Sequence, residues 1–238
     1  MSVKAATPEA GEGAIPDFGS VGSRALSWCG DRLSDLVVGL RPIRFKASGF
    51  DLAKFDAGPC LIIANHVSLL DTLAIRRALP RKIRSRVATV GARDFFQPSS
   101  SDRGLRRILR TLGCVYVTHA YRVCMIGRGD DMGDGIPRML KLLDSGWHVL
   151  LFPEGTRSRT GKSGRYRMGV AHLAERTGVP VIPVGIRGTD GVMRVGSPNI
   201  RPGRIDVRAG EPSRIAPGES HAQFLARMRG AIEALLTP

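Results

Sequence analysis

The stretch CLIIANHVSLLD, residues 60–71, is the clearest indication of how this chain folds. Its first five residues are apolar without interruption, which is typical of a strand buried on both faces of a sheet. The next four residues favour a turn, and Ser68 is a good N-cap for a helix that starts near Leu69. A buried strand, a turn and a helix in succession predict one unit of an α/β sheet.

The same alternation continues along the chain. Short apolar runs predict strands at residues 60–64, 86–90, 114–117, 148–152, 181–186 and 204–207. Helical periodicity predicts helices at residues 71–79, 102–112, 136–145, 169–177 and 221–236. Strands that alternate with helices form sheets covered on both faces. We therefore predict an α/β fold with a single domain, in which helices flank a mostly parallel mixed sheet.

The chain divides into three segments. Residues 1–22 are rich in glycine, alanine, proline and acidic residues without periodicity, and we expect a disordered tail. Residues 23–42 carry apolar side chains at three- and four-residue steps, which predicts an N-terminal amphipathic helix. This helix has two alternatives: it lies in a membrane interface, or it packs on the core of the domain, as Asp31 and Asp35 on its polar face favour. Residues 43–238 form the domain itself.

Composition narrows the class of protein. The chain has 238 residues, enough for one compact domain, and a formal net charge of +15 that comes mostly from arginine. No apolar run approaches the roughly 18 to 20 residues of a membrane span, and the N-terminus lacks the apolar block of a signal peptide. The four cysteines are scattered without metal-binding or disulfide spacing. No nucleic-acid motif accompanies the charge. The positive charge indicates that the protein binds an anionic membrane surface or an anionic substrate, or it reflects the composition of the source genome.

His66 and Asp71 stand five positions apart at the end of the first quoted strand. In a continuous helix their side chains would point about 140° apart, but a turn before the helix lets the histidine fold back toward the aspartate. A carboxylate that holds an imidazole in one tautomer makes the histidine a general base. The alternative is that His66 caps a turn and Asp71 stabilises the start of the helix.

A second stretch, FPEGTRS at residues 152–158, follows another apolar run. Gly155 allows close approach of the backbone to a ligand, and Arg157 offers a planar fork that suits a phosphate. Because ligands bind beyond the carboxyl ends of parallel strands, both stretches are expected to share one crevice. The alternative is a basic surface turn.

Together these stretches resemble the glycerolipid acyltransferase family, which the 1-acylglycerol-3-phosphate (lysophosphatidic acid) acyltransferases typify. The resemblance covers about residues 44–210 and also includes the segment VPVIPV at residues 179–184. It implies that residues 43–238 form an acyltransferase domain. It also implies the transfer of a fatty acyl group from acyl-CoA or acyl carrier protein to the free hydroxyl of a lysophospholipid, with 1-acylglycerol-3-phosphate, which gives phosphatidic acid, as the expected acceptor.

The resemblance implies a role for each matching residue. His66 is expected to be the general base and Asp71 the residue that orients it. Glu154, Gly155, Thr156 and Arg157 are expected to bind the phosphate-bearing end of the acceptor. The reaction implies neither a metal nor a cofactor besides the acyl donor.

The chain departs from the family at one point. His119 stands where an arginine that binds glycerol phosphate is expected, after a predicted strand. Either Arg122 reaches the same phosphate, or the acceptor differs, for example a lyso-ornithine lipid. A thioester or lipid hydrolase that uses the same pair to activate water is the enzymatic alternative, and a basic lipid- or nucleic-acid-binding protein is the alternative without catalysis.

The expected location is the cytoplasmic face of a membrane, with peripheral attachment. The expected partners are the two lipid substrates, the anionic membrane surface and, as one of the two donor carriers, acyl carrier protein. No nucleic-acid partner is expected.

Overall fold

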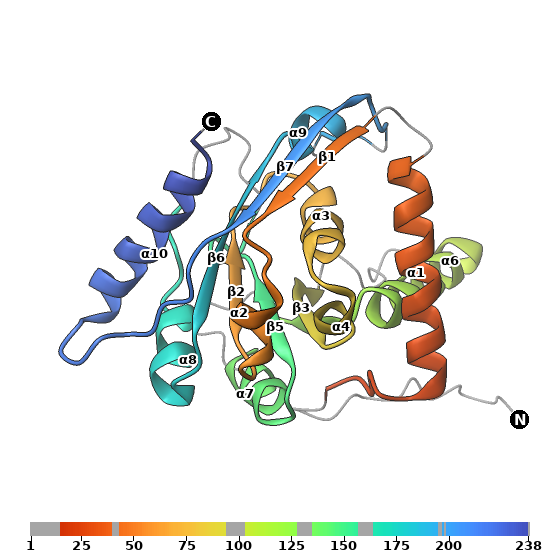
Figure 1. Cartoon of the computed structure of the whole chain (residues 1–238). Helices are drawn as coiled ribbons and strands as arrows, with labels where there is room; N and C mark the ends of the chain where they lie inside the picture. The colour runs from red at the N-terminus through yellow and green to blue at the C-terminus, as the bar shows by residue number, and fades with distance from the viewer. Residues whose placement is uncertain are drawn as a thin grey trace, which may run out of the picture.

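Figure 1 shows the computed structural model, which describes residues 15–39, 43–93, 103–127, 135–156, 164–194, 197 and 199–237. A twisted sheet runs through the molecule and helices cover both of its faces. The strands are β1 (Ile43–Ser48), β2 (Leu61–Ala64), β3 (Val87–Ala92), β4 (Val123–Ile126), β5 (His148–Leu151), β6 (Val181–Arg187) and β7 (Gly203–Ala209). The longer helices are α1 (Val21–Gly39), α3 (Leu70–Ala78), α6 (Gly104–Ala120), α7 (Gly135–Asp144), α8 (Gly169–Thr177) and α10 (His221–Leu235). The short helices are α2 (Leu52–Asp56), α4 (Arg81–Arg84) and α9 (Thr189–Val192).

The seven strands follow the order β1-β7-β6-β2-β5-β3-β4. All neighbouring pairs are parallel except β6 and β7, which are antiparallel. The prediction of a mostly parallel mixed sheet is therefore confirmed. Because β6, β2 and β5 are adjacent and parallel, their carboxyl ends meet at one edge of the sheet. The segments that leave these three strands are thus brought together there.

Two hydrophobic cores lie on the two faces of the sheet. One core contains side chains from α7, α8 and α10, including Met139, Leu173 and Phe224. The other contains side chains from α2, α3, α4 and α9, including Phe55 and Ile75. The residues of β2 are fully buried between the two cores, as their uninterrupted apolar character predicted.

The helices α1 and α6 pack against each other (Figure 1), and α6 also contacts the edge strand β4. The contact of α1 with the domain is made by small and polar residues. The guanidinium of Arg76 lies 3.2 Å from the carboxylate of Asp31, and that of Arg77 lies 3.3 Å from Asp35. Gly30 lies so close to Ala120 that an added Cβ would come within 2.9 Å of the alanine Cβ. The predicted N-terminal helix is present, and its residues Leu33 and Leu36 are exposed to solvent.

The predicted strand at residues 114–117 is wrong, because these residues continue α6 to Ala120. The segment CVYV has a high strand propensity, but it also extends the helical spacing of Leu105, Ile108 and Leu112. The strand follows instead as β4. His119 is therefore a helical residue, and its Nδ1 lies 3.2 Å from Ser23 Oγ on α1.

The predicted tail is too long at its C-terminal end. Residues 1–14 lie outside the described part of the chain, but Phe18 is buried and meets Trp147 edge to face at 5.4 Å. Helix α1 then begins at Val21. Among the described helices, none has both the length and the apolar character that a bilayer span requires.

His148 and Cys60 form a buried pair at the opposite end of the central strands. The thiol sulfur lies 3.1 Å from Nδ1 of the imidazole. Burial raises the pKa of Cys60 to about 12. Burial, reinforced by Arg86, lowers the pKa of His148 from 6.5 to about 4, against the opposing effect of Asp56. The folded protein therefore holds a neutral thiol in contact with a neutral imidazole.

This pair should make the protein less stable in mild acid. The unfolded chain takes up a proton on His148 below pH 6.5, whereas the folded chain does so only near pH 4. The stability of the fold that depends on a neutral His148 is thus fully present above pH 6.5 and is lost as the pH falls toward 4. At pH 5 we expect His148 to account for a loss of about 2 kcal/mol in the free energy of unfolding. Urea denaturation of wild type and His148→Gln at pH 7.5 and 5 tests this, and equal losses in both proteins would contradict it.

Candidate active site

The carboxylate of Asp71 is fully buried and accepts hydrogen bonds on both oxygens. Oδ2 accepts from the backbone N–H groups of Val67 and Ser68, at 2.7 and 2.8 Å, and lies 2.8 Å from Nδ1 of His66. Oδ1 accepts from the hydroxyl of Thr189 at 2.6 Å. A buried group that faces this many donors acts as an acceptor, so the proton of the histidine contact lies on Nδ1.

His66 lies at the end of β2, and its ring is fixed on two sides. The Asp71 carboxylate holds Nδ1, and the ring stacks on Phe152 with centroids 3.9 Å apart and planes at 15°. The other nitrogen, Nε2, is on the side of the ring away from Asp71. With Nδ1 protonated, Nε2 carries a lone pair and can accept a proton. The sequence predicted this pairing of His66 with Asp71, and the structure brings the two side chains together.

The turn between β2 and α3 is tied to the neighbouring segments. The side-chain amide of Asn65 donates to the Ile186 carbonyl and accepts from the Ile186 N–H, both at 2.9 Å. Ser68 Oγ donates to the carbonyl of Met193 at 2.7 Å and accepts from the N–H of Leu70 at 3.2 Å. Ser68 was predicted to be the N-cap, but α3 begins one residue later and its N-cap is Leu69; Ser68 instead supports the turn and accepts from the first residue of the helix. These bonds hold the His66–Asp71 pair, here called the dyad, against β6 and the segment that follows it.

The predicted loop after β5 is described at residues 152–156, and Arg157 lies outside the described residues. Gly155 and Thr156 are exposed and line a cavity next to His66. Glu154 is buried behind them and is not among the residues that line it. Burial raises the pKa of Glu154, and hydrogen bonds from the backbone of Gly164 and His66 oppose this effect. Glu154 thus connects the end of β5 to the end of β2.

The cavity has a volume of about 340 Å³, within the range of small-molecule sites. Its polar lining residues are His66, Thr72, Thr89, Tyr121, Gly155, Thr156 and Arg167. The remaining wall is mostly apolar and comes from the ends of β3, β4 and β5 and from α3, α6, α7 and α8. Its side chains include Val90, Val117, Ile126, Met139, Val170 and Leu173. A substrate whose reactive group lies at His66 can therefore place a long apolar chain inside the cavity.

Arg167 is a site residue that the sequence did not indicate. It lines the cavity, and its side chain covers Gly155, where an added Cβ would come within 2.5 Å of Nε. Gly155 has φ of 69°, a conformation that glycine adopts readily. Arg167 reaches this position because residues 164–167 return to the loop, where the N–H of Arg167 donates to the Pro153 carbonyl at 2.9 Å. No local pattern in the sequence predicts that residues 164–167 fold back to this loop.

Arg122 is not brought to the cavity. It is buried below α1, hydrogen-bonded to the hydroxyl of Ser27, with its guanidinium 5.8 Å from the centre of the Trp147 ring. Burial, together with the nearby Arg76, lowers its pKa to about 10. Its neighbours Tyr121 and Val123 line the cavity, but Arg122 itself does not.

Comparisons with known proteins agree with this geometry. The family model described as acyltransferase matches residues 46–187, more than half of the chain. The chain is 24% identical over 196 residues to a 1-acyl-sn-glycerol-3-phosphate acyltransferase of Cocos nucifera, covering 82% of this chain and 54% of that protein. It is 42% identical over 67 residues to a chloroplastic protein of the same name from Brassica napus, covering 28% of this chain and 20% of that protein. The chain thus spans between about a fifth and about half of these relatives.

A solved structure has the same fold. It is the crystal structure of the 1-acyl-sn-glycerophosphate acyltransferase PlsC from Thermotoga maritima, with a TM-score of 0.66. The alignment covers 90% of this chain and 79% of that chain, at 19% identity. The predicted α/β architecture is confirmed by this similarity and by the sheet itself.

Thr189 should act as a positioning residue for the dyad. Thr189→Val removes the hydroxyl that holds Asp71 Oδ1, and we expect kcat to fall by roughly tenfold or more with little change in KM. Thr189→Ser keeps the hydroxyl and should restore most of the rate. Steady-state kinetics of the three proteins measure this effect. A kcat of Thr189→Val equal to that of wild type would contradict the role.

Proposed function

This chain belongs to the acyltransferase family, and we propose that it transfers a fatty acyl group from a thioester to the free hydroxyl of 1-acylglycerol-3-phosphate, giving phosphatidic acid. The proposed donor is acyl-CoA or acyl carrier protein, with no further cofactor. The observation that carries the proposal is the position of the dyad: Nε2 of His66 is available at an apolar cavity.

The geometry supports a direct transfer. Nε2 of His66 takes the proton of the acceptor hydroxyl while the hydroxyl oxygen attacks the thioester carbonyl carbon. The buried carboxylate of Asp71 stabilises the resulting imidazolium through Nδ1. The tetrahedral intermediate collapses with cleavage of the carbon–sulfur bond, and the leaving thiolate takes the proton from Nε2. The products are the ester and the free thiol, and the histidine returns to its starting form.

The acceptor is proposed from the names of the relatives and from the charge at the cavity. The matched proteins of Cocos nucifera and Brassica napus are named for 1-acyl-sn-glycerol-3-phosphate. Among the lysines and arginines in the described part of the chain, only Arg167 lines the cavity. A guanidinium next to the exposed backbone of Gly155 suits a phosphate monoester. We propose that Arg167, with Gly155 and Thr156, binds this phosphate, and that Arg157 assists.

Product analysis tests the proposed reaction. Purified protein is incubated with labelled acyl-CoA or acyl carrier protein and a panel of lysolipids, and the products are resolved by mass. We expect phosphatidic acid from 1-acylglycerol-3-phosphate, with a rate about 10² to 10⁴-fold lower in His66→Ala. Release of free fatty acid without an acceptor would contradict transfer and indicate a hydrolase. Transfer only to another lysolipid would contradict the proposed acceptor.

Arg167 should affect binding of the acceptor more than the rate of turnover. Loss of a charged hydrogen bond in Arg167→Gln is expected to raise the KM for 1-acylglycerol-3-phosphate by roughly 10- to 100-fold. The matched control is Arg165→Gln, which removes an exposed arginine two residues away that does not line the cavity. Equal KM values in the two variants would count against a phosphate contact at Arg167.

We also propose that the outer face of α1 and α6 binds an anionic membrane. Helix α6 exposes an apolar row, with Leu105 at 70%, Leu109 at 60% and Leu112 at 60% exposed. The helix contains no acidic residue and carries three arginines beside this row. On α1, Trp28 is 63% exposed and Leu36 is 53% exposed.

Monomeric proteins seldom expose such a continuous apolar surface to water. Apolar side chains flanked by arginines are typical of helices that lie in an anionic membrane interface. The last turn of α6 also carries Val117 into the wall of the cavity. A lipid chain that leaves the membrane at α6 is therefore next to the site where it would react.

The membrane proposal predicts a large effect of charge on α6. The variant Ile108→Asp/Leu112→Asp changes only exposed side chains and should fold, yet its binding to vesicles that contain phosphatidylglycerol should fall at least tenfold. Leu52→Asp, an exposed leucine on α2, is the matched control and should bind as wild type does. Co-sedimentation at low and high salt measures both proteins. Undiminished binding of the α6 variant would remove this helix from the interface.

A further inference from the structure

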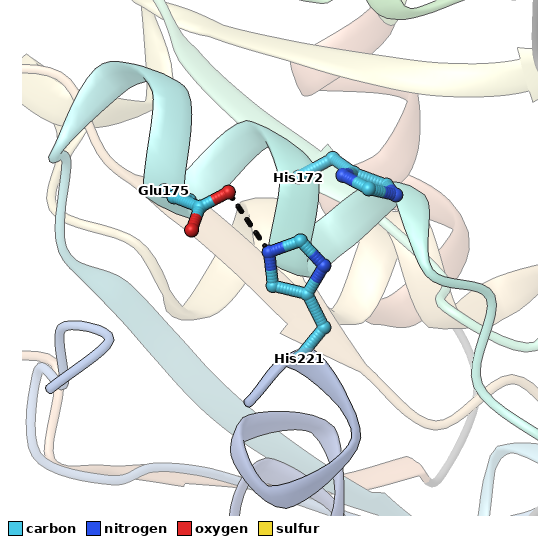
Figure 2. A group of neighbouring side chains, drawn as sticks. All are labelled: His172, Glu175 and His221. Carbon is cyan, nitrogen blue, oxygen red and sulfur yellow. Dashed lines mark hydrogen bonds and ion pairs between the residues drawn. The ribbon is translucent and has the colours of Figure 1, made fainter. Parts of the chain in front are cut away.

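Two histidines and a glutamate meet on the outer side of the molecule, away from the cavity. Figure 2 shows His172 and Glu175 on one helix and His221 on another, with the three side chains pointing toward one another. The ligand atoms that the three residues offer all lie within 4.8 Å of one another. Nε2 of His221 lies 2.9 Å from Oε2 of Glu175, and the two imidazole rings have centroids 4.5 Å apart at an angle of 79°.

The backbone holds this cluster in place. His172 and Glu175 are three residues apart on α8, so their side chains leave the helix on one face. His221 is the first residue of α10, directly after Ser220, which closes a capping box with Gln223. Its position is therefore fixed by the start of a helix and not by a loose loop.

The two helices are also fixed relative to each other. Leu173 and Ala174 of α8 and Phe224 and Met228 of α10 are buried in the same core. The cluster lies on the solvent side of this packed contact. Preorganised ligands on rigid elements lose little freedom when they bind an ion.

The residue types select a class of metal. Two imidazoles and one carboxylate are ligands that Zn²⁺ and similar divalent transition metals accept, whereas Mg²⁺ and Ca²⁺ prefer oxygen ligands only. A tetrahedral Zn²⁺ with bonds of about 2.0 to 2.1 Å holds its ligand atoms roughly 3.3 Å apart. The separation of 2.9 Å between His221 Nε2 and Glu175 Oε2 is somewhat shorter than this value, so only a small opening of the pair is needed to admit the ion. The side chain of His172 is exposed and can rotate to close the remaining distance.

We propose that His172, Glu175 and His221 bind one divalent transition metal ion of the zinc class, with water completing the coordination. The ion would connect α8 to α10. Because Val170 and Leu173 on the inner side of α8 line the cavity, the metal would stabilise the wall of the acyl site without taking part in the transfer. This site is independent of the proposed acyl transfer, since none of its ligands lines the cavity.

Zinc binding to protein without a histidine tag tests the proposal. All proteins carry Cys29→Ser, which removes an exposed thiol, because thiolates are zinc ligands and would compete with the proposed site. Calorimetric titration with Zn²⁺ should give one bound equivalent. With free zinc at a hundredfold excess over the dissociation constant, the midpoint of thermal unfolding should rise by roughly 5 to 10 °C, and a chelator should reverse the rise.

Variants assign the site. His172→Ala and His221→Ala should each weaken zinc binding by roughly 100-fold or more, because even the loss of a supporting residue costs about 10- to 100-fold. His119→Ala is the matched control, since this histidine lies outside the cluster on α6 and should leave binding unchanged. His66→Ala should also bind zinc normally.

The comparison is the change caused by zinc within each protein, because His221→Ala also removes the contact with Glu175 and lowers stability without metal. Absence of a zinc effect in the parent protein would overturn the proposal. Equal zinc binding in the parent and in His172→Ala would overturn it as well.

Discussion

The buried carboxylate of Asp71 is the interaction on which the site depends. A carboxylate without exposure to water is tolerable only when donors surround it, and here they come from two separate parts of the chain. The turn after β2 supplies two backbone N–H groups and an imidazole, and Thr189 after β6 supplies a hydroxyl. The parallel order of β6 and β2 brings these groups to one edge. The order of these two strands therefore allows the Asp71 carboxylate to be buried with all of its hydrogen bonds made.

Apolar surface organises the rest of the molecule in two ways. Inside, the cavity beside His66 has mostly apolar walls from strand ends and from α3, α6, α7 and α8. Outside, α6 turns leucines and isoleucine toward solvent, while α1 attaches to the domain through Ser27, Gly30 and Asp31. This reverses the usual arrangement of an amphipathic helix in a protein that meets only water. Together, the inner cavity and the outer face fit an enzyme whose substrates have long apolar chains.

Much of this architecture could be predicted from the sequence, because its signals are local. The uninterrupted run before Asn65 marked a buried strand, and the bounds of α8 agree with its periodicity. Local signals failed where two periods overlap: residues 114–117 suit a strand by propensity but continue a helix. They also failed for Thr189 and Arg167, which join the site through contacts between distant segments. The residues on either side of Arg122 line the cavity, but Arg122 itself has a positive φ of 51° and its side chain is buried against α1.

The central claim is that Asp71 fixes His66 in the tautomer with a proton on Nδ1, so that Nε2 is free to act as a base. Nitrogen-15 NMR of histidine-labelled protein at neutral pH, with His66 assigned by comparison with His66→Gln, reads this state directly. We predict a protonated Nδ1 with a proton resonance shifted far downfield by the carboxylate, and an unprotonated Nε2. A proton on Nε2 with an unprotonated Nδ1 would contradict the account, because the nitrogen that meets the substrate would then be unable to accept its proton.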